Sequence, residues 1–176
     1  MNKWKTLSSK YVFKNKYFNV RKDEYERHDQ VHGTYWVLER CPSVFVLAIT
    51  ENDEVYFIRQ FRYPTKTWSL EIVAGATDGE DTLKAAKREL KEETGLIATS
   101  WTYCGIMQVA PGLSDNIGHI FVARGLTQTD DNEQHEEGII ECIKLTKKEI
   151  IEKIKSGEIS DGPTMAVLTK VHCSLS

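Results

Sequence analysis

Residues 75–96 read GATDGEDTLKAAKRELKEETGL, and this stretch decides how the rest of the chain is interpreted. Apolar residues recur at helical spacing from Asp81 to Thr94, and Gly95 stands where such a helix would stop. We therefore predict a helix over this range, entered from a polar loop.

Three carboxylates share one face of this predicted helix. Glu89 lies one turn from both Glu92 and Glu93, and like charges at that spacing repel by roughly a few tenths of a kcal/mol per pair. Mg²⁺ prefers carboxylate oxygens and usually bridges protein to phosphate, so a bound metal would offset the repulsion. Glu80 is placed to reach the same cluster, and Arg88 can hold the carboxylates by hydrogen bonds. The plainer alternative is a solvated helix face whose cations balance the acids.

The segments around this helix are patterned mainly as strands. We predict strands at Tyr11–Phe13, Tyr17–Tyr25, Thr34–Leu38, Ser43–Thr50, Val55–Arg62, Trp68–Val73, Trp101–Met107, Gly118–Ala123 and Ile139–Leu145, with turns at 15–16 and 32–33. Thr146 and Glu149 fit a capping box for a helix to about Lys155, and Pro163 could open a last helix to about His172. Strands around a helix, followed by a helical end, predict an α/β (α+β) fold.

Size, charge and cysteine usage exclude several classes of protein. A chain of 176 residues and 20.2 kDa suffices for one full domain with a buried core. The net charge of -3 argues against a nucleic-acid partner, and the longest apolar run, Val44–Ile49, is far below the roughly 20 residues that span a membrane. The N-terminal residues lack the apolar stretch of a signal peptide. The four cysteines, Cys41, Cys104, Cys142 and Cys173, show no CxxC spacing, which is typical of reduced thiols in a cytoplasmic protein.

The stretch from Glu80 to Leu96 resembles the Nudix box. That family's pattern is Gly, five residues, Glu, seven residues, then Arg-Glu-apolar-any-Glu-Glu-any-Gly-apolar, and every specified position from Glu80 onward matches at the right spacing. One departure is that only four residues separate Gly75 from Glu80. A one-residue deletion in a loop is well tolerated, so we expect it to leave the helical glutamates in place.

The likeness covers roughly residues 10–150. Residues 59–64 (RQFRYP) and 70–75 (LEIVAG) are similar to the stretch before the box in ADP-ribose pyrophosphatases, and Pro111-Gly112 is similar to a downstream segment of those enzymes. The resemblance implies a Nudix-type α/β/α sandwich with a mixed sheet and a small N-terminal antiparallel β extension. It places the extension at residues 1–41, where it would form a homodimer, and the hydrolase domain at residues 42–176.

The resemblance also implies which residues hold the metal. Glu89 and Glu93 would be the principal ligands, with the backbone carbonyl of Ala74 completing the site and Glu80 or Glu92 assisting. The metal would be Mg²⁺, with Mn²⁺ as an alternative, and Arg88 would organise the carboxylates.

The catalytic base is harder to place. The family supplies a glutamate from the loop before the late strand, here Asp130–Gly138. Alignment without gaps puts Gly138 at that position, with Glu136 and Glu137 one or two positions early. We prefer Glu137 to Glu136 as the base, and the alternative is that both are solvated loop acids.

The resemblance further implies substrate contacts. Arg62 matches an arginine beside the phosphates, although an exposed strand-end cation is the alternative. Arg59, Glu71 and Pro111 belong to the same similar segments. Trp36 sits where the family places an aromatic ring that stacks on adenine, and a core or interface role is equally consistent with such a large ring.

The resemblance implies hydrolysis of the diphosphate of a nucleoside diphosphate sugar, with ADP-ribose giving AMP and ribose 5-phosphate. The alternatives are another nucleotide-sugar or dinucleotide, such as GDP-mannose or NADH, and a non-catalytic module that senses nucleotides. An isomerase on the same fold would need an acid and thiol pair, and no such motif surrounds Cys41 or Cys104.

Overall fold

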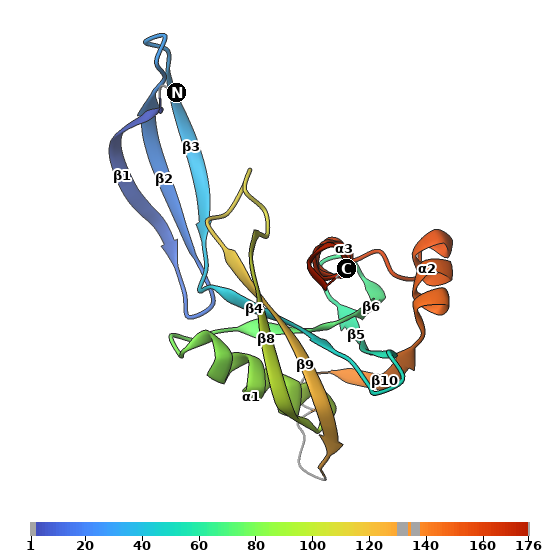
Figure 1. Cartoon of the computed structure of the whole chain (residues 1–176). Coiled ribbons are helices and arrows are strands. Elements are labelled where there is room, and N and C mark those ends of the chain that lie inside the picture. The colour runs from blue at the N-terminus through green and yellow to red at the C-terminus, as the bar shows by residue number, and fades with distance from the viewer. Residues whose placement is uncertain (1–2, 130–133, 135–137, 176) are drawn as a thin grey trace. The chain divides into compact units, whose positions relative to one another are not determined.

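The structure, a computed structural model, describes residues 3–129, 134 and 138–175. It divides into two units, made of residues 1–42 with 108–117 and of residues 43–107 with 118–176. We describe each unit by itself (Figure 1). The strands are β1 (Lys5–Lys14), β2 (Asn19–Glu26), β3 (His32–Glu39), β4 (Ser43–Ala48), β5 (Val55–Arg62), β6 (Thr67–Glu71), β7 (Val73–Ala76), β8 (Leu96–Gln108), β9 (Ile117–Gln128) and β10 (Ile139–Leu145). The helices are α1 (Thr82–Thr94), α2 (Lys147–Ser156) and α3 (Gly162–Leu175).

The first unit is built on an antiparallel sheet in the order β1-β2-β3. Asn15 sets the turn between β1 and β2, because its side-chain oxygen accepts hydrogen bonds from the N–H groups of Tyr17 and Phe18, each at 2.8 Å. The N–H of Leu38 in β3 donates to the carbonyl of Leu113 at 2.9 Å, which joins the 108–117 segment to this sheet.

The turn predicted at residues 32–33 is wrong. The chain reverses at residues 27–31, where the N–H of Arg27 donates to the carbonyl of Val31 at 2.8 Å. Gly33 lies inside β3 opposite Tyr25, and a Cβ at Gly33 would stand 2.5 Å from the tyrosine hydroxyl oxygen. This glycine therefore makes room for a ring that packs against the strand.

The second unit holds a mixed sheet in the order β7-β4-β9-β8, with β4 parallel to β9 and antiparallel to β7. Every residue from Val44 to Ala48 is buried, as expected for a central strand covered on both faces. A separate antiparallel sheet has the order β10-β5-β6. The predicted α/β (α+β) class with a mixed sheet is confirmed.

The predicted single strand from Trp68 to Val73 is wrong, because the chain forms two strands that belong to different sheets. β6 ends at Glu71 in the three-stranded sheet, and β7 begins at Val73 in the four-stranded one. The buried Ile72 separates them, and its N–H donates to the hydroxyl of Thr164 at 3.2 Å. Glu71 and Ala74 are close in the sequence, and because of this crossing they lie on two different sheets.

Helix α1 packs its apolar face on β4 and β7. Ala85, Ala86 and Leu90 are fully buried in one cluster with Val44 and Val46, and burial of a leucine side chain stabilises the fold by about 1.5–3 kcal/mol.

Local signals fix the ends of the helices. The Asp81 side chain caps α1 by accepting from two backbone N–H groups, Gly95 ends it in the left-handed conformation, and the predicted capping box at the start of α2 is confirmed.

Candidate active site

Two carboxylates of helix α1 are buried against β7. Glu89 is 8% exposed and Glu93 is 4% exposed. One Glu93 oxygen accepts a hydrogen bond from the N–H of Ala74 at 3.1 Å, and a Cβ on Gly75 would lie 2.0 Å from the carboxyl carbon of Glu89. Only a residue without a side chain lets the Glu89 carboxylate rest there, so β7 and α1 together fix both groups.

Arg88 gathers the surrounding oxygen atoms. Its Nε donates to Glu80 at 3.0 Å, and its Nη1 donates to Glu89 at 2.9 Å and to Glu92 at 2.8 Å. Its Nη2 donates to the carbonyl of Ala76 at 2.9 Å. Burial lowers the pKa of Arg88, but the carboxylates of Glu80, Glu89 and Glu92 together raise it by more. The pKa of Arg88 is therefore above its usual value. A permanently charged guanidinium thus holds three glutamates that would otherwise repel one another.

The shortened loop before the helix forms a tight turn. The N–H of Glu80 donates to the carbonyl of Thr77 at 2.8 Å, and the two central residues, Asp78 and Gly79, have φ values of 48° and 83°. Positive φ at both central positions is typical of the type I′ turn, for which Asp-Gly is a favoured pair. The one-residue deletion is accommodated here, upstream of the glutamates.

The carboxylates and carbonyl around β7 fit a divalent metal. Within the described ranges, no three His, Cys, Asp or Glu side chains are grouped closely enough to hold an ion by themselves. Mg²⁺ is commonly held by only one or two carboxylates together with substrate phosphates. Glu89 and Glu93, buried beside the backbone of Ala74, supply hard oxygen donors of this kind.

Arg62 and Glu71 form a two-pronged ion pair next to this cluster. Arg62 Nε donates to one Glu71 oxygen at 2.9 Å and its Nη2 donates to the other at 2.5 Å. The pKa of Arg62 is raised, chiefly by these bonds and further by the negative charges of Glu71, Glu93 and Asp161, against the lowering effect of burial. The structure therefore brings the predicted Arg62 and Glu71 together, close to Glu93 of helix α1.

Arg59, also predicted as a substrate contact, is not brought into this cluster. Residues three apart on a strand point to opposite faces, and Arg59 donates instead to Glu141 at 2.7 Å and to Glu158 at 2.8 Å. Lys153 donates to the same Glu158 at 2.7 Å. This network ties β5 to β10 and to the end of α2.

Trp36 and Pro111 lie in the first unit. Trp36 is 51% exposed on β3, with the Nζ of Lys22 6.0 Å from its ring centre. Pro111 is exposed in the 108–117 segment, which Tyr35 joins to β3 by donating its hydroxyl to the carbonyl of Gly112 at 2.7 Å. Glu136 and Glu137, the candidate bases, lie outside the described residues.

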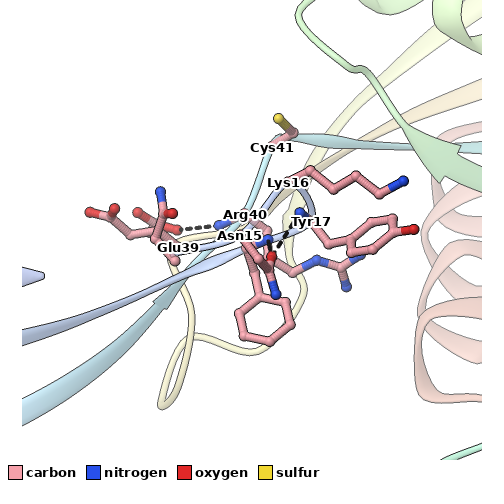
Figure 2. Close-up of a pocket in the computed structure, with 9 residues that line it drawn as sticks. Asn15, Lys16, Tyr17, Glu39, Arg40 and Cys41 are labelled. Atoms are coloured by element: carbon pink, nitrogen blue, oxygen red, sulfur yellow. Dashed lines mark hydrogen bonds between the residues drawn. The ribbon is translucent and has the colours of Figure 1, made fainter. Parts of the chain in front are cut away.

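The first unit also contains a pocket of about 320 Å³ (Figure 2). Lys16 and Tyr17 extend side by side from the β1–β2 turn, with Arg40 and Cys41 nearby. The pocket is lined by residues 15–19, 39–41 and Asp115. None of the predicted site residues lines it.

Sequence reasoning missed Gln60 and Cys142. Gln60 is only 8% exposed, and its place two residues before Arg62 on a strand was the signal that both face the same side. Cys142 lies opposite Ile58 in β10. Burial, together with the charge of Glu93 in helix α1, raises the pKa of its thiol to about 11, so the thiol is neutral near pH 7.

These observations define a class of protein. It is a mixed α/β protein in which two glutamates of a helix, Glu89 and Glu93, are buried against a strand that contains Gly75. A NUDIX domain model matches residues 39–167, and the model for the nucleoside diphosphate sugar hydrolase N-terminal domain matches residues 4–38. The chain belongs to the NUDIX domain family, and the prediction of a Nudix hydrolase is confirmed.

Its relatives include two kinds of pyrophosphatase. The ADP-ribose pyrophosphatase of Bacillus subtilis (strain 168) is 28% identical over 162 residues, which cover 91% of this chain and 88% of that protein. The GDP-mannose pyrophosphatase of Yersinia enterocolitica is 32% identical over 134 residues, covering 72% and 70%. A solved structure, "Crystal structure of ADP compounds hydrolase", has a TM-score of 0.84 at 23% identity and covers 98% and 94% of the two chains, which shows the shared fold. No helix in the described part of the chain is long and apolar enough to cross a membrane.

Proposed function

We propose that this protein hydrolyses the diphosphate bridge of a nucleoside diphosphate sugar, with ADP-ribose as the leading substrate and AMP and ribose 5-phosphate as products. The observation that carries the proposal is the buried pair Glu89 and Glu93, held against Ala74 and Gly75 beside the Arg62–Glu71 ion pair. The names of the relatives and the match of residues 4–38 support the choice of substrate class.

The residues would share the work as follows. Glu89, Glu93 and the carbonyl of Ala74 would hold Mg²⁺, or Mn²⁺ as an alternative, and the metal would supply positive charge that neutralises the charge developing on the diphosphate. Arg88 keeps the glutamates in place, and Arg62, held by Glu71, would bind a phosphate oxygen. Hydrogen bonds to phosphate from a guanidinium are charge-assisted and directional.

A general base would remove the proton of the attacking water, typically contributing about 10²–10⁴-fold to the rate. We propose Glu137 for this role, with Glu136 second and Glu92 third. The matched variants Glu137→Gln and Glu136→Gln decide between the first two, because only loss of the base should lower kcat with little change in KM. If neither variant is slowed, both loop assignments are wrong.

The relatives named GDP-mannose pyrophosphatase favour a second candidate substrate. A third candidate is a nucleotide-sensing module without turnover, and the presence of Glu80, Arg88, Glu89, Glu92 and Glu93 in one connected cluster argues for hydrolysis instead. The test is a comparison of kcat/KM for ADP-ribose, GDP-mannose, NADH and a diadenosine polyphosphate with Mg²⁺ present. A tenfold advantage for GDP-mannose or NADH, which is about 1.4 kcal/mol, would overturn the ADP-ribose assignment.

We further propose that residues 1–41 form a dimerising extension of a hydrolase domain at 42–176, in a cytoplasmic protein. Large apolar side chains of the small sheet are about half exposed, among them Trp4, Tyr11, Phe13 and Trp36, and a three-stranded sheet is marginal by itself. Cys41, Cys104 and Cys142 are unpaired, which suits a reducing compartment. A monomer of 20.2 kDa by sedimentation at micromolar concentration would contradict the dimer.

A further inference from the structure

The three residues from Glu71 to Val73 carry the chain from one sheet to another inside the second unit. Glu71 ends β6 opposite Ile58, and Val73 begins β7 opposite Val46. Glu71 is 4% exposed, Ile72 1% and Val73 0%. Among the described residues, Ile72 pairs in neither sheet, so its buried N–H needs a hydrogen-bond partner from outside the sheets.

Thr164 of α3 supplies that partner. Its hydroxyl accepts the hydrogen bond from the Ile72 N–H at 3.2 Å, and only 1% of Thr164 is exposed. Its own N–H donates to the Asp161 side chain at 2.8 Å, and the N–H of Met165 donates to the Asp161 carbonyl at 3.1 Å. These two bonds cap the start of the helix, so the crossing at Ile72 is tied to a part of the fold with a defined conformation.

Groups of the candidate site lie on both sides of this tie. One residue before the crossing point, Glu71 holds Arg62 by two hydrogen bonds. Two residues after it, the N–H of Ala74 donates to Glu93 at 3.1 Å. The charges of Glu93 and Asp161 both help to raise the pKa of Arg62, which indicates that α1 and the start of α3 come near the same guanidinium. A displacement of the crossing would therefore change the distance between Arg62 and Ala74.

We propose that Thr164 is a positioning residue, whose hydroxyl sets the spacing between the arginine that would bind phosphate and the groups that would hold the metal. This rests on the proposed function, in which Arg62 binds a phosphate oxygen while Ala74 and Glu93 hold the metal. A diphosphate held at both places requires a fixed distance between them, and a misplacement of about 1 Å can lower a rate roughly a hundredfold. With 1% of its surface exposed, Thr164 acts through the crossing and not by contact with the substrate.

The test measures the binding of ADP by calorimetry, with and without Mg²⁺, to wild type, Thr164→Val and Thr164→Ser. Valine has the shape of threonine without the hydroxyl, whereas serine keeps the hydroxyl. Thr164→Val should weaken the binding of ADP with Mg²⁺ by roughly tenfold or more, because the metal and Arg62 must hold the diphosphate together. Without Mg²⁺ only the arginine holds it, and the affinity should stay within about twofold. Thr164→Ser should bind as wild type does in both conditions.

Thr169→Val is the matched control. Thr169 lies further along α3, is exposed, and donates its hydroxyl within the helix to the carbonyl of Met165 at 2.9 Å. This variant should match wild type with and without Mg²⁺. Equal weakening by Thr164→Val in both conditions would show that the hydroxyl serves Arg62 alone, and no weakening in either would show that it serves only the packing of α3. Each of these results would overturn the proposal.

Thermal unfolding measures the structural part of the effect separately. Thr164→Val leaves a buried N–H without a partner and should unfold at a lower temperature than wild type, so binding is measured well below that temperature. Thr164→Ala removes the same hydroxyl without adding a second methyl group, and it replaces the valine variant if that variant does not fold. If neither variant folds, the role of Thr164 is structural and the proposal is overturned.

A double-mutant cycle adds a result that a loss of stability alone would not produce. Arg62→Lys should raise KM for the nucleotide-sugar by about tenfold in the wild-type background. Once Thr164→Val has displaced the arginine from the metal groups, the same change should raise KM by about threefold or less. Additive effects would refute the assignment. Failure of the proposed function would appear in the wild type itself, as no hydrolysis and no gain in ADP affinity from Mg²⁺, whereas failure of this inference leaves both wild-type properties intact.

Discussion

Strand β5 carries two arginines that face opposite ways and form two different ion-pair clusters. Arg62 is locked to the buried Glu71, beside the glutamates of α1. Arg59, on the other face, is shared between Glu141 and Glu158, whose side chains are 45% and 35% exposed. Both clusters contain the same kinds of residues, so only their surroundings separate them.

The difference lies in the balance of charge and burial. In the Arg59 network, Lys153 adds a second cation for two partly solvated carboxylates. Around α1, Glu89 and Glu93 are both nearly buried, and burying charge is costly unless it is paired or bound to a metal. Glu89 is paired with Arg88, and both buried glutamates lie on the face where we propose the metal site. The balanced network on the other face ties β5 to β10 and to the end of α2.

The strongest test of this contrast is Glu93→Gln against Glu158→Gln. Glu93→Gln keeps an oxygen that can accept from the N–H of Ala74, so the fold should survive, but it removes one metal ligand and should cost roughly a hundredfold or more in kcat. Glu158→Gln should leave turnover within about twofold. If Glu93→Gln retains more than about a tenth of the wild-type rate at saturating Mg²⁺, the metal assignment is wrong.

Gly75→Ala tests whether the strand shapes the metal site. A methyl group there would lie 2.0–2.3 Å from the Glu89 carboxylate atoms, and the flexible carboxylate must move away while the strand remains. The Mg²⁺ concentration for half-maximal activity should rise by about 10–100-fold. Gly162→Ala is the control, because nothing lies within 4 Å of a Cβ at that position. A normal Mg²⁺ requirement in Gly75→Ala would remove Glu89 from the ligand set.

Arg62→Lys and Arg59→Lys form a matched pair with a smaller expected effect. Lysine keeps the charge but cannot reproduce the two-pronged bond to Glu71 or to a phosphate. Arg62→Lys should raise KM for the nucleotide-sugar by about tenfold, and Arg59→Lys should leave KM unchanged. Measured KM values that respond equally, or in the reverse order, would show that the two faces of β5 have been assigned the wrong way round.

The sequence predicted those elements whose local signals are complete. The helix from Asp81 to Gly95 has its cap, its apolar stripe and its stop within one stretch, and the capping box at Thr146 is equally local. The crossing at Ile72 was missed because the apolar-polar alternation of residues 68–72 looks the same whether the chain stays in one sheet or passes into the next.

For the site, spacing along the chain placed the glutamates of α1 on one face, because helical geometry relates them directly. It did not reveal that Arg59 and Arg62 diverge, although strand alternation contained that information. The choice between Glu136 and Glu137 depends on a loop conformation, and the burial of Gln60 depends on how a sheet packs on a helix. Neither property is encoded in the spacing of nearby residues.

The pH dependence of stability gives the smallest and most selective test of the balanced network. Hydrogen bonds from Arg59, and then from Lys153, hold the pKa of Glu158 below its usual value of 4.5. A carboxyl whose pKa is lowered in the folded protein stabilises it above the unfolded pKa, and this contribution is lost as the pH falls through the folded value. Glu158→Gln should therefore be less stable than wild type at pH 7, by about 1 kcal/mol or less for so exposed a pair. Below pH 4.5 the difference should shrink progressively, as the wild-type carboxyl becomes protonated.

Urea unfolding of both proteins at several pH values between roughly 7 and 3 measures this directly. A difference that stays constant across that range would mean that the ion pairs of Glu158 do not contribute to stability, and the contrast between the two faces of β5 would then rest on Glu89 and Glu93 alone.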